Sequence, residues 1–167
     1  MPLTLKHPMD KVNIKKGASY EIILTFTPVA ACWRIDSLET LRSFCTDILK
    51  TLKTVHGLGF VHRDIRADNI LLGSGFLVID WELAAPIGSE VFWEVPSGRH
   101  PAGVTIGSQW LPWMDLWQLG KAIEGLTGDM RSHAWVTSFK TKLLNHGFES
   151  AHDALEGLTH GAQSELR

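Results

Sequence analysis

The sequence has few cysteines, a single tyrosine and no long apolar run. Its two cysteines, Cys32 and Cys45, form no C-x-x-C pair, and its eight histidines lack metal-ligand spacing, which argues against a disulfide framework or a zinc site. No stretch approaches the roughly 18 apolar residues that a membrane-spanning helix needs. The first residues, MPLTLKHPMDK, lack the apolar core of a secretory signal. We therefore expect an intracellular protein, in the cytoplasm or nucleus, with reduced thiols and no membrane partner.

The sequence also lacks an excess of charge of either sign. Its formal net charge is −2 and its pI is near 6.4, so electrostatics gives no case for a nucleic-acid partner. A length of 167 residues with 44% hydrophobic and 20% charged residues is typical of one globular domain. Five of the seven tryptophans lie between Trp81 and Trp117, which predicts either a bulky core or a partner-binding surface there.

The strongest periodic pattern predicts a helix over Asp36–Val55. Apolar residues recur through it at helical spacing: Leu38, Leu41, Phe44, Cys45, Ile48, Leu49, Leu52 and Val55. Asp36 and Glu39 predict a capping box at its start, and Gly57 predicts its end. Because Cys45 falls on the apolar face, we expect it to be a buried free thiol.

Strand signals are short. The β-branched and aromatic run Tyr20–Thr27 predicts a strand, and Lys11–Ile14 is a candidate partner for it in a hairpin. Ile70–Leu72 and Phe76–Ile79 predict a second hairpin, joined by Gly-Ser-Gly. Strands are therefore a minor part of the expected fold.

The second half of the chain predicts helices after a long irregular segment. Residues 83–112 are rich in proline and glycine and predict that segment. Pro112–Leu126 is apolar almost all round, which predicts a buried helix. Two more helices are predicted at 132–145 and 150–159. Their predicted caps are Ser132 for the first and the pair Ser150 and Asp153 for the second. The fold class is therefore mainly α with a small β part (α+β).

The stretch FVHRDIRADNILL carries the strongest functional signal. Asn69 follows Asp64 by five positions, and Asp80 follows Asp64 by sixteen, after the predicted hairpin. Phosphoryl transfer needs a group that orients the attacking hydroxyl and oxygen ligands that hold Mg²⁺ near the phosphates. Asp64 suits the first role, while Asn69 and Asp80 suit the second. Arg66 is positioned to stabilise the transferring phosphoryl group.

These motifs resemble the C-terminal lobe of the eukaryotic protein kinase family. VHRDIRADNIL resembles the catalytic loop, IDWE stands where the metal-binding DFG motif belongs, and MDLWQLG resembles the D-x-W start of the buried central helix. The resemblance implies ATP and Mg²⁺ as cofactors, a catalytic Asp64 and cofactor or metal binding by Asn69 and Asp80. It also implies that Asp115, near Trp117 in the third motif, hydrogen-bonds the backbone of the catalytic loop.

The resemblance spans about residues 20–160. It implies a single protein-kinase-like domain over 1–167, in which 1–30 are a remnant of the N-lobe sheet and the hinge, and 31–161 are the C-lobe. A narrower likeness is to the kinase-like domains of the crinkler effectors of oomycetes and fungi, which share HRDIR and a D-[FW]-E motif. The HRD-x-R-A-x-N pattern also resembles cytoplasmic tyrosine kinases, so it does not settle hydroxyl specificity.

Three further residues of these motifs have structural or regulatory interpretations. His62 belongs to the catalytic-loop motif itself. Arg63 either contacts a phosphorylated residue in the segment after Asp80 or braces the loop. Glu82 replaces the flexible glycine of the metal-binding motif; it either adds a metal ligand or salt bridge or, as we favour, makes a structural contact that fixes the loop.

The sequence departs from the family in ways that bear on activity. It has no G-x-G-x-x-G loop and no strand lysine in the family's context, its A-P-E equivalent is at most VPS, and no arginine occurs between residues 132 and 161. We therefore expect weak or no kinase activity from the chain as given. Three interpretations remain open. They are a protein kinase domain that is truncated or completed by a partner, a pseudokinase-type binding module whose partner covers the missing N-lobe, and a small-molecule phosphotransferase of the aminoglycoside or choline type.

Overall fold

The computed structural model describes residues 33–94, 96–126, 130 and 132–164, with side chains described up to residue 159. The predicted strands at Tyr20–Thr27 and Lys11–Ile14 lie outside these residues, and so do Cys32 and the expected N-lobe remnant and hinge.

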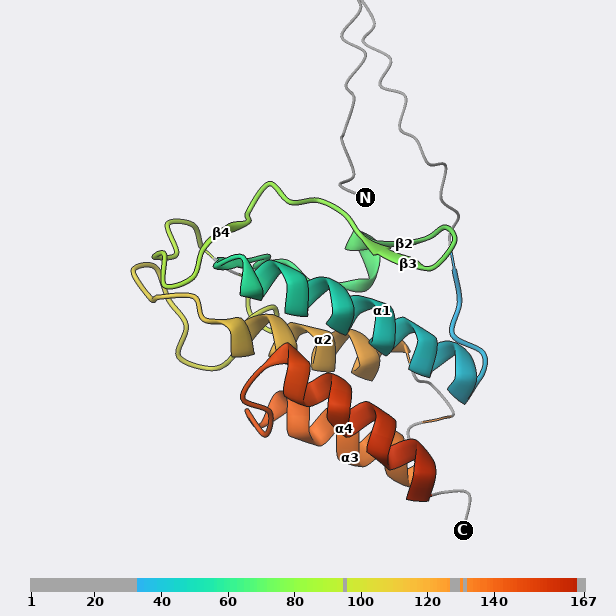
Figure 1. Cartoon of the computed structure of the whole chain (residues 1–167). Helices are drawn as coiled ribbons and strands as arrows, with labels where there is room; N and C mark the ends of the chain where they lie inside the picture. The colour runs from blue at the N-terminus through green and yellow to red at the C-terminus, as the bar shows by residue number, and fades with distance from the viewer. Residues whose placement is uncertain (1–32, 95, 127–129, 131, 165–167) are drawn as a thin grey trace, which may run out of the picture.

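The described chain is mainly helical, with two small antiparallel sheets, as the sequence predicts (Figure 1). Its elements, in order, are α1 (Leu38–Gly57), β1 (Phe60–Val61), the 3₁₀ helix η1 (Ala67–Asn69), β2 (Ile70–Leu72), β3 (Phe76–Val78), β4 (Ala85–Pro86), α2 (Pro112–Leu126), α3 (Ala134–Leu144) and α4 (Ala151–Ser164). β2 pairs with β3 in the predicted hairpin, and β1 pairs with β4.

The N-terminal cap of α1 is Ser37, so the predicted capping box is wrong by one residue. The Ser37 hydroxyl accepts a hydrogen bond from the backbone N–H of Thr40 at 3.1 Å. Asp36 lies before the cap and accepts from the Thr40 hydroxyl at 3.2 Å instead. The helix ends at Gly57, as predicted, and Gly59 follows with a φ of 85°, where glycine is favoured.

The main core is formed by the four helices and the β2–β3 hairpin. Figure 1 shows the hairpin on one side of α1, with α3 and α4 on the other side. α1 packs against α4 and β3, and α2 packs against α3. α2 is buried over most of its surface, as its apolar pattern predicts, and two of its buried residues, Asp115 and Gln118, are polar. Both side chains form hydrogen bonds with the backbone of residues 62–65, so α2 holds that loop in place.

The caps of the last two helices differ in how well the sequence predicts them. His133, not Ser132, caps α3, because the backbone oxygen of His133 accepts the first helical bond, from Thr137. Ser150 and Asp153 act as the predicted pair: the Ser150 hydroxyl accepts from the Asp153 N–H at 3.1 Å, and Asp153 accepts from the backbone before the helix. α4 ends at Ser164, five residues beyond its predicted end.

A second, smaller core lies under the irregular segment 83–112. It consists of the buried residues Val61, Val91, Val104, Trp110 and Met114, with Trp93 and Trp113 packed against them. Three tryptophans of the predicted tryptophan-rich region thus belong to this core or pack against it, which supports the first of its two interpretations, whereas Trp81 is 40% exposed. An isolated bridge between Glu90 and Gln109 helps to close the segment on itself.

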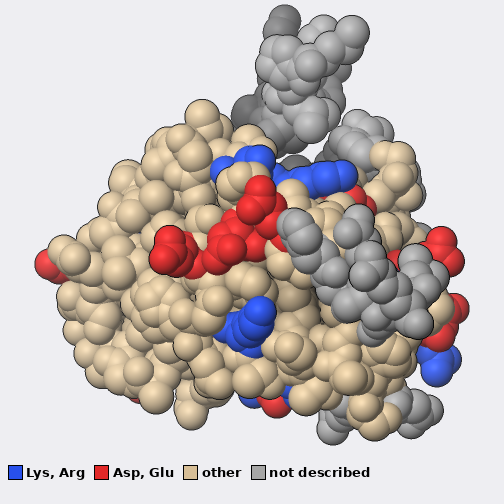
Figure 2. Space-filling view, turned by 60° about the horizontal axis from the view of Figure 1, so that its bottom comes forward, with Lys and Arg blue, Asp and Glu red and all other residues tan. Residues whose placement is uncertain are grey.

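The apolarity of the helices and the charge of the surface agree with the composition of the sequence. None of the helices within the described ranges combines the length and apolarity needed to cross a membrane. Surface charge is mixed: on the face shown in Figure 2, acidic side chains form a band with basic side chains on both sides, and most of the surrounding surface is uncharged.

Candidate active site

The side chain of Asp115, in α2, fixes the start of the catalytic loop by hydrogen bonds to its backbone. Its carboxylate is fully buried and accepts backbone N–H bonds from His62 at 2.8 Å and from Arg63 at 2.9 Å. It also accepts from the Trp110 indole at 3.0 Å and pairs with the His56 ring at 3.0 Å. A buried carboxylate needs such donors, because an unpaired charge in the interior costs several kcal/mol. The expected bonds from Asp115 to the catalytic-loop backbone are therefore present.

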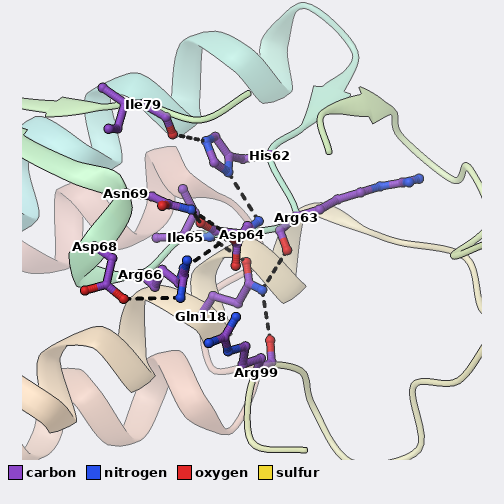
Figure 3. A network of polar contacts seen from close by, with 10 residues as sticks. All are labelled: His62, Arg63, Asp64, Ile65, Arg66, Asp68, Asn69, Ile79, Arg99 and Gln118. Atoms are coloured by element: carbon purple, nitrogen blue, oxygen red, sulfur yellow. Dashed lines mark hydrogen bonds and ion pairs between the residues drawn. The ribbon is translucent and has the colours of Figure 1, made fainter. Parts of the chain in front are cut away.

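Gln118, three residues further along α2, is a site residue that the sequence reasoning missed. Its amide nitrogen donates to the backbone oxygens of Arg63 at 2.8 Å and Arg99 at 2.9 Å, and its amide oxygen accepts from the Ile65 N–H at 2.9 Å. Figure 3 shows it between the catalytic loop and Arg99. The available signal was a single amide in a helix whose apolar residues lie almost all round it. The neighbouring Trp117, which the sequence singled out, is half-buried and lines a hollow beside the loop.

His62 connects the catalytic loop to the segment that carries Asp80. Its Nδ1 accepts from the Asp64 N–H at 3.2 Å, so its Nε2 carries the hydrogen that is donated to the Ile79 oxygen at 3.1 Å (Figure 3). The Trp81 ring packs on it edge to face, 4.5 Å between centroids. Burial lowers the pKa of His62, against the opposing effect of nearby carboxylates, so the neutral ring fits this geometry.

Asp64, Asn69 and Arg66 form one polar cluster. The Asn69 amide nitrogen donates to the Asp64 backbone oxygen at 3.0 Å and to its carboxylate Oδ2 at 2.7 Å. Arg66 bridges the Oδ2 atoms of Asp64 and Asp68, each at 3.2 Å (Figure 3). Both bonds fall on Oδ2 of Asp64, so Oδ1 makes no bond within the described residues. An open carboxylate oxygen on a fixed side chain is what an incoming hydroxyl requires.

Asp80 directly follows a residue that is hydrogen-bonded to this cluster. The Ile79 N–H donates to the Asn69 backbone oxygen at 2.9 Å, which fixes the residue before Asp80 against the catalytic loop. Asp80 is exposed and has a φ of 60°, and Arg63 has a φ of 76°. Backbone in this region is strained for residues other than glycine and concentrates at functional sites. The three sequence-predicted residues Asp64, Asn69 and Asp80 thus come from one connected region.

Within the described residues, Glu82 makes no contact of the kind that we favoured. Its side chain is exposed and forms no hydrogen bond or ion pair with the residues that the structure describes. A carboxylate two residues beyond Asp80 gains more from water than from the apolar surface near Trp81, which accounts for its exposure.

Arg63 braces the segment that follows Asp80. Its side chain is 2% exposed, its guanidinium donates to the Ser89 backbone oxygen at 2.8 Å, and it lies 5.4 Å from the centre of the Trp93 ring. Burial lowers the pKa of Arg63, although Asp115 opposes the change. These contacts support the interpretation in which Arg63 braces the loop.

The donor chemistry suits Mg²⁺ that is shared with a phosphate ligand. Within the described ranges, no three His, Cys, Asp or Glu side chains gather as a metal cage. Mg²⁺, however, is usually held by one or two protein oxygens together with phosphate and water. Asn69 uses its amide nitrogen for Asp64, which leaves its amide oxygen for a cation. The Asp80 carboxylate is exposed, and Asp80 follows Ile79, whose backbone N–H bonds the Asn69 backbone oxygen. These two residues therefore fit the group that the resemblance implies.

Comparison with known proteins points in the same direction. No family model matches the chain. The serine/threonine-protein kinase PAK 5 of Rattus norvegicus is 30% identical over 106 residues, or 54% of this chain and 14% of that kinase. The serine/threonine-protein kinase pak-1 of Caenorhabditis elegans is 29% identical over 114 residues, 60% of this chain and 18% of the kinase. Cyclin-dependent kinase F-3 of rice, Oryza sativa, is 30% identical over 95 residues, 54% of this chain and 22% of the kinase.

These similarities define a protein-kinase-like region over about half of the chain. The chain spans less than a quarter of the length of each relative named. Its fold is the mainly helical α+β arrangement of a kinase C-terminal lobe with two small antiparallel sheets.

Proposed function

We propose that this chain carries a phosphoryl-transfer site that uses ATP and Mg²⁺ and acts on protein hydroxyls. The observation that carries the proposal is the connected arrangement of Asp64, Asn69 and the Asp80 segment. His62 and Ile79 link its parts by hydrogen bonds. Phosphoryl transfer depends mainly on positioning and electrostatics, and both need such a fixed constellation.

Each residue has a role that follows from its contacts. Asp64 orients the acceptor hydroxyl and accepts its proton at the open carboxylate oxygen. Asn69 and Asp80 would hold Mg²⁺, which when bound neutralises charge on the phosphates. Arg66 is held beside Asp64 by two carboxylates, so its charge is kept next to the reacting groups. We expect this chemistry to take place inside the cell, where ATP is available.

Slow transfer is expected from these 167 residues alone, because they contain no glycine-rich phosphate loop and no strand lysine in the family's context.

The decisive experiment is single-turnover transfer from γ-labelled Mg²⁺-ATP to dephosphorylated casein. We expect slow, Mg²⁺-dependent labelling that falls about a hundredfold or more in Asp64→Asn and is unchanged in Asp36→Asn, a matched change at an exposed aspartate. Equal labelling by the wild type and Asp64→Asn would refute the proposal.

A binding role is a second candidate, and one observation favours it. Leu72, Leu77 and Trp81, near the β2–β3 hairpin, are 36%, 36% and 40% exposed. Exposed apolar groups next to a site are common where a partner covers it. A chain that binds a protein partner but shows no Asp64-dependent labelling would fit this pseudokinase-type role.

A further inference from the structure

A hollow of about 370 Å³ opens directly beside Asp64. One wall is the catalytic loop from Asp64 to Asp68, a second is formed by Gly98 and Arg99, and a third is formed by α2 residues including Trp117 and Lys121. Because the hollow begins at the candidate base, whatever fills it lies next to the hydroxyl that Asp64 would orient.

Gln118 fixes the walls of this hollow relative to each other. One amide group bonds the catalytic loop, through Arg63 and Ile65, and the backbone of Arg99. Figure 3 shows the Arg99 side chain beside Gln118, on the same side as Arg66. The position of Arg99 is therefore tied to that of the catalytic loop, although 35 residues separate it from Asp64 in the sequence.

The charges around the hollow are balanced at every cation but one. Arg66 bridges Asp64 and Asp68, and Lys121 pairs with Glu124, which Lys140 also approaches at 3.9 Å. The Arg99 side chain is exposed and forms no ion pair with any residue in the described ranges. The wall formed by Gly98 and Arg99 thus carries a guanidinium that is available to a ligand.

We propose, on the basis of the function proposed above, that this hollow receives the acceptor segment of a protein substrate and that Arg99 selects an acidic side chain near the acceptor hydroxyl. A guanidinium pairs with a carboxylate in a two-bond geometry that a neutral or basic side chain cannot reproduce. Asp68 at the rim weakens this preference little, because its carboxylate is paired with Arg66 and is 78% exposed, so solvent screens its repulsion. Arg99 is in this account a specificity-determining residue, and Asp64 remains the catalytic one.

The test is a binding comparison with two labelled peptides. Each has a central serine, flanked in one by two glutamates on each side and in the other by two lysines on each side. Affinities are measured by fluorescence anisotropy at low salt, and two-dimensional NMR of the tryptophan indole N–H groups reports the location. The Trp117 signal is assigned through Trp117→Phe. We expect the wild-type protein to bind the glutamate peptide about five- to tenfold more tightly and to shift the Trp117 signal.

Arg99→Glu should abolish or reverse the preference, whereas Arg34→Glu, which makes the same change of net charge at an exposed arginine outside the hollow, should retain it. Because both arginines are exposed, both variants should fold, which thermal unfolding verifies. Equal affinity of the wild type for the two peptides, or equal effects of the two variants, would overturn the proposal.

The outcome is separable from that of the phosphoryl-transfer proposal. If the acidic preference is present and depends on Arg99 while Mg²⁺-ATP does not bind, the hollow is an acidic-peptide site and the transfer function is wrong. If Asp64-dependent transfer is present and no acidic preference appears, only the role assigned to Arg99 is wrong.

Discussion

Asp115 is the residue on which the geometry of the catalytic loop most depends. We predict that Asp115→Asn lowers the free energy of unfolding by about 2–4 kcal/mol, because an amide nitrogen would face donors that now meet a carboxylate oxygen. Urea denaturation measures this change. The control is Asp36→Asn, at an exposed aspartate whose replacement should cost less than about 0.5 kcal/mol. Equal urea midpoints for the two variants would show that the Asp115 carboxylate does not contribute this stability.

His62 makes stability depend on pH. Its folded pKa is lowered below the ordinary 6.5, so between the two values the unfolded chain binds a proton that the folded chain does not. The free energy of unfolding should therefore fall as the pH falls through about 6.5, by at most about 1.4 kcal/mol per pH unit for this one proton. His62→Gln should flatten the slope between pH 7 and 5.5.

His152 in α4 supplies the control for this pH dependence, since its side chain is 55% exposed and its pair with Glu156, itself 60% exposed, is screened by solvent. His152→Gln should keep the wild-type slope. If both variants had the wild-type slope, the buried histidine would not be the source of the effect.

Single residues also show where sequence reasoning stops. Spacing alone pointed to Asp64, Asn69 and Asp80, because a short loop and a hairpin leave few ways to place them. Gln118 escaped notice because its partners are backbone atoms 53 and 55 residues earlier in the chain and 19 residues earlier at Arg99. Backbone partners leave no signature in the sequence. Glu82 is the opposite case: a contact was predicted from its acidic side chain, and within the described residues the side chain is exposed instead.

At the scale of the elements, helix existence and helix ends follow different physics. The pattern of apolar residues predicted both α1 and α2. A helix buried on one face, such as α1, needs apolar residues at helical spacing, and a helix buried almost all round, such as α2, needs them on every face. The starts of α1 and α3 were displaced by one residue, because a cap depends on which oxygen accepts the first helical bond, and neighbouring Asp, Ser and His residues compete for that role. Hairpin β2–β3 was predicted by its turn.

The packing of α4 offers a test at this scale. A Cβ added at Gly157 would lie 2.9 Å from the Phe148 ring, so Gly157→Ala should destabilise the protein by about 1–2 kcal/mol. Gly125→Ala in α2 meets no atom within 4 Å and should be neutral or stabilising by up to about 1 kcal/mol. Thermal unfolding of the two variants decides the matter. Gly157→Ala with a stability at or above that of Gly125→Ala would contradict this packing.

At the scale of the whole molecule, two separate hydrophobic cores stabilise different parts of the fold. The larger core holds the helices together, and the smaller core, around Trp110, holds segment 83–112 against the catalytic loop. The sequence predicted that this segment is irregular but not that it carries a core of its own. That core joins Val61 and Met114, which lie far apart in the chain, and such pairing is a tertiary property.

Both cores hold the elements that carry Asp64, Asn69 and Asp80, the residues of the Mg²⁺ and ATP site that we propose. The most direct measurement is calorimetric titration of ATP into the protein with and without Mg²⁺, for the wild type, Asp80→Asn and the control Asp36→Asn. We predict that Mg²⁺ tightens ATP binding about tenfold or more in the wild type and the control, and that Asp80→Asn loses this gain. ATP affinity that is the same with and without Mg²⁺, or a full Mg²⁺ effect in Asp80→Asn, would contradict the account.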